Sequence, residues 1–216
     1  MALLLSAVGH ASHHSQSDSV EREVAVMLVD FRWGQPERRL LPHDLLYALN
    51  RFSEIVGDTS RVAGGLPNQF MGDRVMVLFG LGVASREANR QALLAAAQLD
   101  LRLDALRVEL RRELSCATGH VIHLHTGMAA VGETGDHLTR TVTAAGSAIN
   151  VVRQLAAIDE RRSTQRAAGR EERRIVVSRA VWIAAQRETQ LLHWHERELP
   201  GGIRIGLARL DAASAQ

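Results

Sequence analysis

Gln69-Phe-Met-Gly-Asp-Arg-Val-Met-Val-Leu-Phe-Gly80 is the stretch of this 216-residue sequence that decides the fold. Apolar residues stand on both sides of the pair Gly72-Asp73, and after the pair they line both faces of a short extended segment. A Gly-Asp pair between two apolar runs is a strong hairpin signal, so we expect two short strands with Asp73 at the turn. A carboxylate held there suits a metal ligand, although Asp is also common in turns for conformational reasons alone.

A second acid ends an apolar run upstream, Glu23-Val-Ala-Val-Met-Leu-Val-Asp30. The run predicts a buried central strand. A buried carboxylate is costly unless it is paired or bound to a cation. If the hairpin lies beside this strand, Asp30 and Asp73 meet at one end of the sheet and could hold two Mg²⁺ ions. Asp30 could equally be a helix N-cap or a turn residue.

Composition bounds the class of protein. Hydrophobic residues make up 46% of the chain, which excludes a disordered protein, and the formal net charge of +2 gives no general reason for nucleic-acid binding. The sequence contains no lysine, so mechanisms that need one are excluded. The single cysteine, Cys116, cannot form an internal disulfide, which favours a reducing, cytoplasmic setting. No apolar run reaches the roughly 20 residues that span a bilayer.

The pattern along the chain predicts one α/β domain at residues 22–210, with a flexible leader at 1–21 and a tail at 211–216. We expect a mobile surface loop at the charged run 159–174. Asp44 is expected to cap the first helix, and Ser178 a short later one. The other predicted elements are helices at 45–56, 85–112 and 149–158, and strands at 120–126, 138–142, 175–177, 191–195 and 203–210.

Histidines occur in two groups that could bind a metal. His10, His13 and His14 lie in the leader, where a polar linker is the better interpretation. His123 and His125 share one face of a predicted strand, and a His-x-His pair can chelate zinc. Because a structural zinc site needs four ligands and no third is evident nearby, we favour ordinary strand histidines.

In this order of elements, four stretches together resemble the class III nucleotide cyclase domain, the catalytic domain of adenylate and guanylate cyclases. The match runs from about Arg22 to Leu210. The resemblance implies a ferredoxin-like palm sandwich of the α/β (α+β) class, with a mainly antiparallel sheet flanked by helices, which works as a head-to-tail homodimer or with another cyclase domain. The stretches are Val26-Met-Leu-Val-Asp-Phe-Arg-Trp-Gly34, Phe70-Met-Gly-Asp-Arg-Val-Met-Val-Leu-Phe-Gly80, His125-Thr-Gly-Met-Ala-Ala-Val-Gly-Glu-Thr-Gly135 and Gly146-Ser-Ala-Ile-Asn-Val-Val-Arg-Gln-Leu155.

One half of the implied site carries the metal. By resemblance, Asp30 and Asp73 match the two metal-binding aspartates, and the backbone carbonyl of Phe31 adds a ligand for two Mg²⁺ or Mn²⁺ ions. Arg32 and Gly34 belong to the same substrate-binding stretch. In such enzymes one ion helps the ribose 3′-hydroxyl attack the α-phosphate, the other holds the triphosphate, and pyrophosphate leaves.

The partner subunit supplies the other half, and here the sequence departs from the family. Asn150 matches the asparagine that orients the ribose, and Thr143 matches a base contact. The purine-reading lysine falls at Gln69, and the arginine that stabilises the transition state falls at Gln154. Arg153 stands beside that position, but one helical step turns a side chain by about 100°. Arg153 would serve only if the helix were shifted or rotated.

The resemblance implies a signal-transduction domain that converts a nucleoside triphosphate, ATP first, to a 3′,5′-cyclic nucleotide and pyrophosphate. We expect low activity alone, because losing one transition-state donor costs about 10²–10³ in rate. Gln69 leaves the base open, since an amide both donates and accepts hydrogen bonds. The alternative is a degenerate cyclase module that binds nucleotide, or pairs with another cyclase chain, without turnover. A third interpretation is a ferredoxin-like domain in which Asp30 and Asp73 lie far apart.

Overall fold

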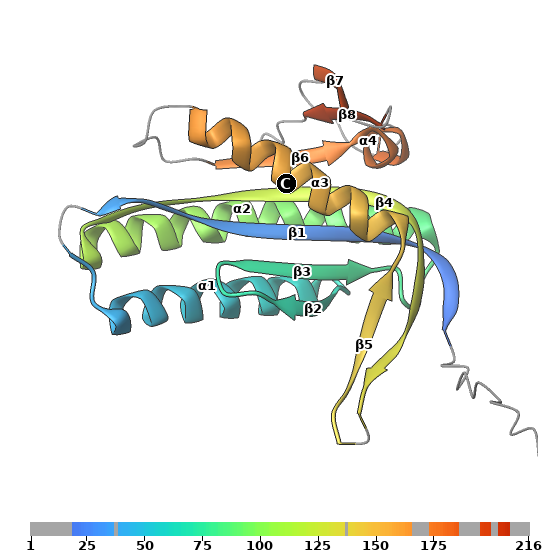
Figure 1. The fold of residues 1–216 in the computed structure, drawn as a ribbon, viewed down its shortest axis with the longest axis horizontal. Coiled ribbons are helices and arrows are strands. Elements are labelled where there is room, and N and C mark those ends of the chain that lie inside the picture. Colours follow the sequence, from blue (N-terminus) through green and yellow to red (C-terminus); the bar gives the residue numbers. More distant parts are fainter. Residues whose placement is uncertain are drawn as a thin grey trace, which may run out of the picture.

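The computed structural model describes residues 19–36, 39–136, 138–165, 173–185, 195–199 and 203–207. Its strands are β1 Val20–Pro36, β2 Leu66–Phe70, β3 Arg74–Phe79, β4 Cys116–Gly135, β5 Arg140–Ala145, β6 Arg173–Ser178, β7 His195–Leu199 and β8 Ile203–Leu207. They form one eight-stranded sheet in the order β2-β3-β1-β4-β6-β8-β7, with β5 paired to β4 off this path (Figure 1). Every pair is antiparallel except β4 with β6, so the expected mainly antiparallel sheet is confirmed.

Helices cover both faces of the sheet. They are α1 Pro42–Val62, α2 Ser85–Leu114, α3 Ser147–Gln165 and α4 Arg179–Ala185. Side chains of α1, α2 and α4 pack into one hydrophobic core and those of α3 into another, and Figure 1 shows α3 in front of the sheet with α2 behind it. The expected sandwich is therefore confirmed. No helix in the described part of the chain is long and apolar enough to cross a membrane.

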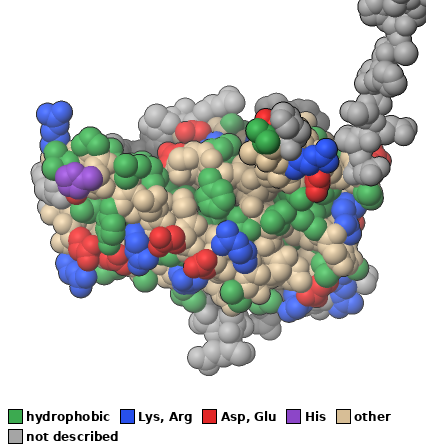
Figure 2. Space-filling model, turned by 90° about the horizontal axis from the view of Figure 1, so that it is seen from below, with side chains coloured by type: hydrophobic (Ala, Val, Ile, Leu, Met, Phe, Trp, Pro, Cys, Tyr) green, Lys and Arg blue, Asp and Glu red, His purple; other side chains and the backbone are tan. Residues whose placement is uncertain are grey.

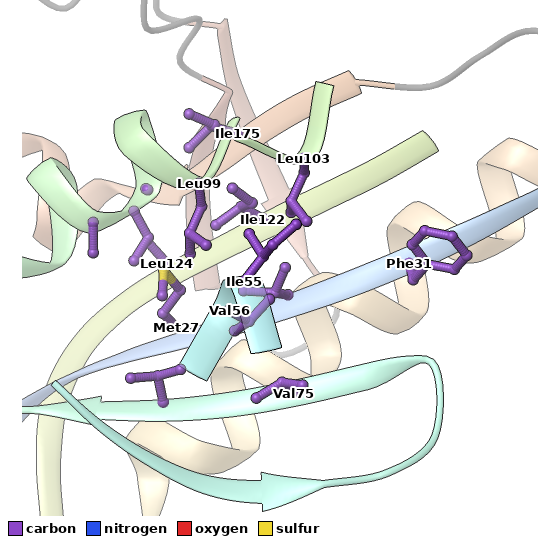
Figure 3. Close-up of a cluster of buried hydrophobic side chains, with 14 of the residues drawn as sticks. Met27, Phe31, Ile55, Val56, Val75, Leu99, Leu103, Ile122, Leu124 and Ile175 are labelled. Carbon is purple, nitrogen blue, oxygen red and sulfur yellow. The ribbon is translucent and has the colours of Figure 1, made fainter. Parts of the chain in front are cut away.

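Strand β1 is the centre of the molecule because both of its faces are buried. Met27 and Phe31 join the core under α1 and α2 (Figure 3), whereas Val26 and Leu28 join the core under α3. A strand with two buried faces has apolar residues in succession instead of alternating with polar ones. The same alternation of sides puts Asp30 on the α3 side, so the acid lies where a helix covers the sheet.

The predicted hairpin is confirmed. Strands β2 and β3 pair across the turn, and the backbone N–H of Met71 donates to the carbonyl of Arg74 at 2.8 Å. Gly72 has a φ of +71°, a conformation that costs glycine little and strains other residues. The residue pair that predicted the turn from the sequence is thus the one whose backbone needs a glycine.

Several predicted boundaries are wrong. Strand β1 continues past Asp30, where the predicted strand ends, to Pro36. The first helix begins at Pro42 with Leu41 as N-cap, and Asp44 lies in its first turn, where its carboxylate accepts a hydrogen bond from the Leu41 N–H at 3.0 Å. Asp44 still satisfies a free N–H at the helix start, but from inside the helix. Strand β1 begins at Val20, inside the stretch predicted as leader; residues 1–18, with His10, His13 and His14, lie outside the described residues.

Both ends of the predicted mobile loop at residues 159–174 are regular structure instead. Helix α3 continues to Gln165, and β6 begins at Arg173; residues 166–172 lie outside the described part. Arginine, glutamate and glutamine are good helix formers, so a charged run can extend a helix whose earlier turns are already packed. Strand β7 begins at His195, the last residue of the strand predicted at 191–195, whose first four residues are not described.

The helical surfaces carry charge of both signs. Arg90 bonds Glu87 at 2.6 Å, and Arg107 bonds Asp104 at 2.8 Å, each pair three residues apart on α2. Acidic and arginine side chains are also interspersed on the face that Figure 2 shows. Such mixtures behave as solvated faces and not as a field of one sign.

Candidate functional site

Asp30 lies near the end of the buried segment of β1 and is 2% exposed. Both of its carboxylate oxygens accept hydrogen bonds from arginines. Arg74 Nε donates to Oδ1, and Arg32 Nη2 donates to Oδ2 at 3.2 Å. Burial lowers the pKa of Arg74, but the hydrogen bond and charge of Asp30, together with the charges of Glu160 and Asp73, outweigh burial and raise the pKa above its ordinary value. Two guanidinium groups, which we call the arginine pair, thus neutralise one buried carboxylate.

Asp73 lies on the exposed turn beside this group. In the β1–β3 register Asp30 is directly opposite Arg74, and the N–H of Phe31 donates to the carbonyl of Asp73 at 2.7 Å. The backbones of the two acids therefore meet partway along β1, at the point where β3 begins. The Asp73 charge also acts on the Arg74 guanidinium.

A second carboxylate covers the arginine pair from helix α3. Glu160 Oε1 lies 3.8 Å from Arg32 Nη1, and its Oε2 lies 3.8 Å from Arg74 Nη2. From the sheet side, His123 Nδ1 lies 3.5 Å from Asp30 Oδ2. The result is a layered cluster with the buried acid at the bottom, the arginine pair above it and Glu160 at the outer edge.

This donor set does not fit a divalent cation as it is bonded here. Mg²⁺ takes oxygen ligands at about 2.1 Å, and both Asp30 oxygens face guanidinium groups instead. A cation at that distance would also lie against two positively charged guanidinium groups. Among the described residues no group of three or more His, Cys, Asp or Glu side chains could hold a metal ion. Both expected acids are present, but two arginines bond the Asp30 oxygens that were expected to bind metal.

A second polar group joins β2, β5 and α3 on the same side of the sheet. Arg153 Nη2 donates to Gln69 Oε1 at 3.2 Å, and Asn68 donates its side-chain N–H to the carbonyl of Val142. Thr143, the next residue on β5, is half-buried. The structure thus brings together Gln69, Arg153 and the strand that carries Thr143, which the sequence assigned to one half of the site.

Asn150 and Gln154 are exposed on the first turns of α3. The helix begins beside the β4–β5 hairpin and crosses the sheet face (Figure 1). Ten residues separate Asn150 from Glu160, which corresponds to about 15 Å along a helix. On one chain, the residues expected near the ribose therefore lie well apart from the Asp30 cluster.

No protein-family model and no curated protein matches the sequence, but solved structures match its fold. The adenylyl cyclase CyaB from P. aeruginosa is 17% identical with a TM-score of 0.71, over 90% of this chain and 97% of that one. The guanylyl cyclase Cya2 is 18% identical with a TM-score of 0.66, over 88% and 93%. The guanylate cyclase domain of RhGC from Catenaria anguillulae, solved with GTP, is 14% identical with a TM-score of 0.63, over 88% and 96%. This chain has the fold of a class III nucleotide cyclase catalytic domain.

Within this cyclase fold, two residues predicted near the substrate have packing roles. The Phe31 side chain is 4% exposed and contacts the ring of Trp33 edge-on at 4.8 Å between centroids, so only its backbone reaches the rim. A Cβ on Gly34 would lie 2.6 Å from the carbonyl oxygen of Ala117 on β4. Gly34 is thus explained by the close approach of two strands, and its substrate role stays a prediction.

The histidines of β4 contact other side chains of this chain. His125 Nδ1 lies 2.8 Å from Ser178 Oγ, and burial lowers the pKa of His125 to about 4, so the ring is neutral near pH 7. His120 Nε2 lies 2.9 Å from the Asp100 carboxylate inside the core. His123 faces Asp30. These contacts favour strand histidines over a zinc pair among the described residues.

Sequence reasoning missed Arg74 and Glu160. Arg74 directly follows Asp73 and alternates onto the side that faces Asp30 once β1 and β3 are in register. A signal for it existed, because a buried acid needs a cation and an arginine stood next to the turn. Glu160 was hidden because its segment was predicted as a loop. Arg32 was predicted to bind substrate, and the structure gives it a carboxylate partner on each side.

Proposed function

We propose that this chain is a nucleotide-binding domain of the cyclase type, which works in a dimer and turns nucleoside triphosphate over slowly at most. The observation that carries the proposal is the convergence of Gln69, Arg153 and the Thr143 strand at the place where the resemblance puts base recognition. The amide of Gln69 and the Thr143 hydroxyl are groups that read a base by hydrogen bonding. ATP is the first candidate ligand.

The dimer is supported by the distance between the two halves. Asn150 lies about 15 Å along α3 from the Asp30 cluster, so a head-to-tail pair would let each copy complete the other's site. The partner is a second copy or another cyclase chain. The guanylyl cyclase domain of the RhoGC fusion protein from Blastocladiella emersonii, which has this fold at 14% identity and a TM-score of 0.64, is described as a non-canonical dimer.

Slow turnover is supported by two features of different origin. Gln154 puts a neutral amide where the resemblance requires a cation at the transition state, a loss of about 10²–10³ in rate. The Asp30 oxygens are bonded to the arginine pair and not exposed to a metal. Both features favour binding over chemistry.

A second candidate is the full reaction, in which ATP or another triphosphate gives a 3′,5′-cyclic nucleotide and pyrophosphate with Mg²⁺ or Mn²⁺. It is favoured by the backbones of Asp30 and Asp73 meeting where β3 begins. The cations would have to displace both arginines from Asp30. If this candidate is correct, Gln69→Lys with Gln154→Arg raises product formation by about 10²-fold; an unchanged low rate supports the binding domain.

The deciding experiment is calorimetric titration of the full chain with ATP, GTP, UTP and CTP, with EDTA and with Mn²⁺, followed by chromatography for cyclic product. We expect at least one nucleotide to bind, with little or no product, and Gln69→Ala to weaken binding. Arg90→Ala, an arginine paired with Glu87 elsewhere on the surface, is the matched control and should bind as the unmodified chain does. No binding of any of the four nucleotides in either condition would overturn the proposal.

A further inference from the structure

The arginine pair already holds one anion loosely. Each oxygen of the Glu160 carboxylate faces one guanidinium group, Arg32 on one side and Arg74 on the other, and both separations are 3.8 Å. That is beyond hydrogen-bond length, and the Glu160 side chain is 57% exposed. Ion pairs of this kind contribute little to stability. Glu160 therefore marks a position between Arg32 and Arg74 that accepts two anionic oxygens. The 3.8 Å distances leave room for an anion to approach the arginines more closely.

The two guanidinium groups are fixed from below. Arg74 Nε and Arg32 Nη2 bond the buried Asp30 carboxylate, while Arg74 Nη2 and Arg32 Nη1 face Glu160. A guanidinium is planar and presents its N–H groups in a fixed fork, so anchoring one edge orients the other. Two such edges that face the same side match the oxygens of a phosphate, which arginine binds in a bidentate manner.

The charges favour an added anion. Two guanidinium cations face one buried carboxylate, and the outer negative charge belongs to the exposed Glu160. Asp73, on the exposed turn near Arg74, repels an added anion, but solvent screens its charge more than that of a buried group. Displacing Glu160 would leave the pair with one unneutralised positive charge to offer a ligand.

We infer that the arginine pair binds the phosphate chain of the nucleotide directly, without a divalent cation, and that Glu160 is an internal competitor for the same place. The inference rests on the proposed function, because it names how that ligand is held. The guanidinium groups then provide the positive charge that cations provide elsewhere, and Asp30 serves as their anchor instead of a metal ligand. Binding then requires the exposed Glu160 side chain to move away from the two arginines.

The test is calorimetric titration in EDTA at low salt with two probes, ATP and inorganic tripolyphosphate. We expect both to bind. Arg74→Gln, which keeps an amide donor for Asp30, should weaken both by about tenfold or more. Glu160→Gln, on an exposed helix position, should keep the fold and tighten both by up to about fivefold. Arg90→Gln is the control and should change neither.

The outcomes separate this inference from the proposed function. ATP binding that requires Mg²⁺ or Mn²⁺ overturns the arginine site and leaves the nucleotide-binding domain standing. Tripolyphosphate binding in EDTA, with no nucleotide bound in any condition, supports the phosphate site and overturns the domain's proposed role. Weaker binding by Glu160→Gln overturns the competitor role, because a residue that competes cannot help when it is charged.

Discussion

The two polar groups on the α3 side of the sheet are built in opposite ways. Around Asp30 the carboxylate is 2% exposed, and strand register brings Arg74 to it. Around Gln69 an exposed arginine of α3, Arg153, bonds a neutral amide. The first group is part of the protein interior, and removing a member leaves a buried charge. The second group is a surface contact that a ligand can replace at little cost.

The largest expected effect is on the free energy of unfolding, when the group around Asp30 loses an arginine. Arg74→Ala leaves the buried Asp30 with Arg32 as its only described arginine partner, and we expect the free energy of unfolding to fall by about 3 kcal/mol. Urea denaturation followed by circular dichroism measures it. Asp30→Ala is the informative comparison, because it leaves the arginines, which are partly exposed, without a buried charge. A loss from Arg74→Ala below about 0.5 kcal/mol would mean that solvent already neutralises Asp30.

The hairpin, the buried strand and the longest helix could be predicted from the sequence, because residues within each element determine its structure. Gly72 marked the hairpin because the turn needs a positive φ, and the apolar run before Asp30 marked a strand with two buried faces. The stripe of leucines and alanines along 85–112 gave α2 almost to its last residue, Leu114. Each of these signals lies within one element, so a single chain carries it.

What the sequence did not predict depends on contacts between elements. The bond from Arg74 to Asp30 follows from the pairing of β1 and β3, and neither strand alone contains that register. Glu160 reaches the arginine pair because α3 extends through a charged run that reads as a loop. Gly34 looked like a ligand-binding glycine and is explained by the backbone of Ala117, which is far away in sequence.

A smaller effect concerns His125, a half-buried residue on the same side of the sheet. Its folded-state pKa of about 4 lies below its ordinary value of 6.5. Between pH 6.5 and about 4, His125 therefore binds a proton in the unfolded chain but not in the folded chain. Stability should fall as pH falls from 6.5 to about 4, with about 1.5 kcal/mol lost between pH 6.5 and 5. Denaturation at a series of pH values measures the slope.

Carboxylates titrate over part of the same range, so the His125 contribution is taken as a difference between variants. His125→Asn should lose about 1.5 kcal/mol less than the unmodified chain over pH 6.5 to 5. Asn150→Ala is the control, because this exposed residue of α3 does not titrate, and its slope should equal that of the unmodified chain. Equal slopes for His125→Asn and the unmodified chain would mean that the ring is solvated when the chain is folded.

The smallest effect is expected at the exposed group. Arg153→Ala removes a surface hydrogen bond to Gln69 and should change the free energy of unfolding by no more than about 0.5 kcal/mol. The same change should weaken nucleotide binding severalfold, because Gln69 loses the partner that fixes its amide. A stability loss close to that of Arg74→Ala would place both groups in the interior and remove the distinction between them. Unchanged nucleotide affinity would limit base recognition to Gln69 and Thr143, since the helix would then contribute no contact of its own.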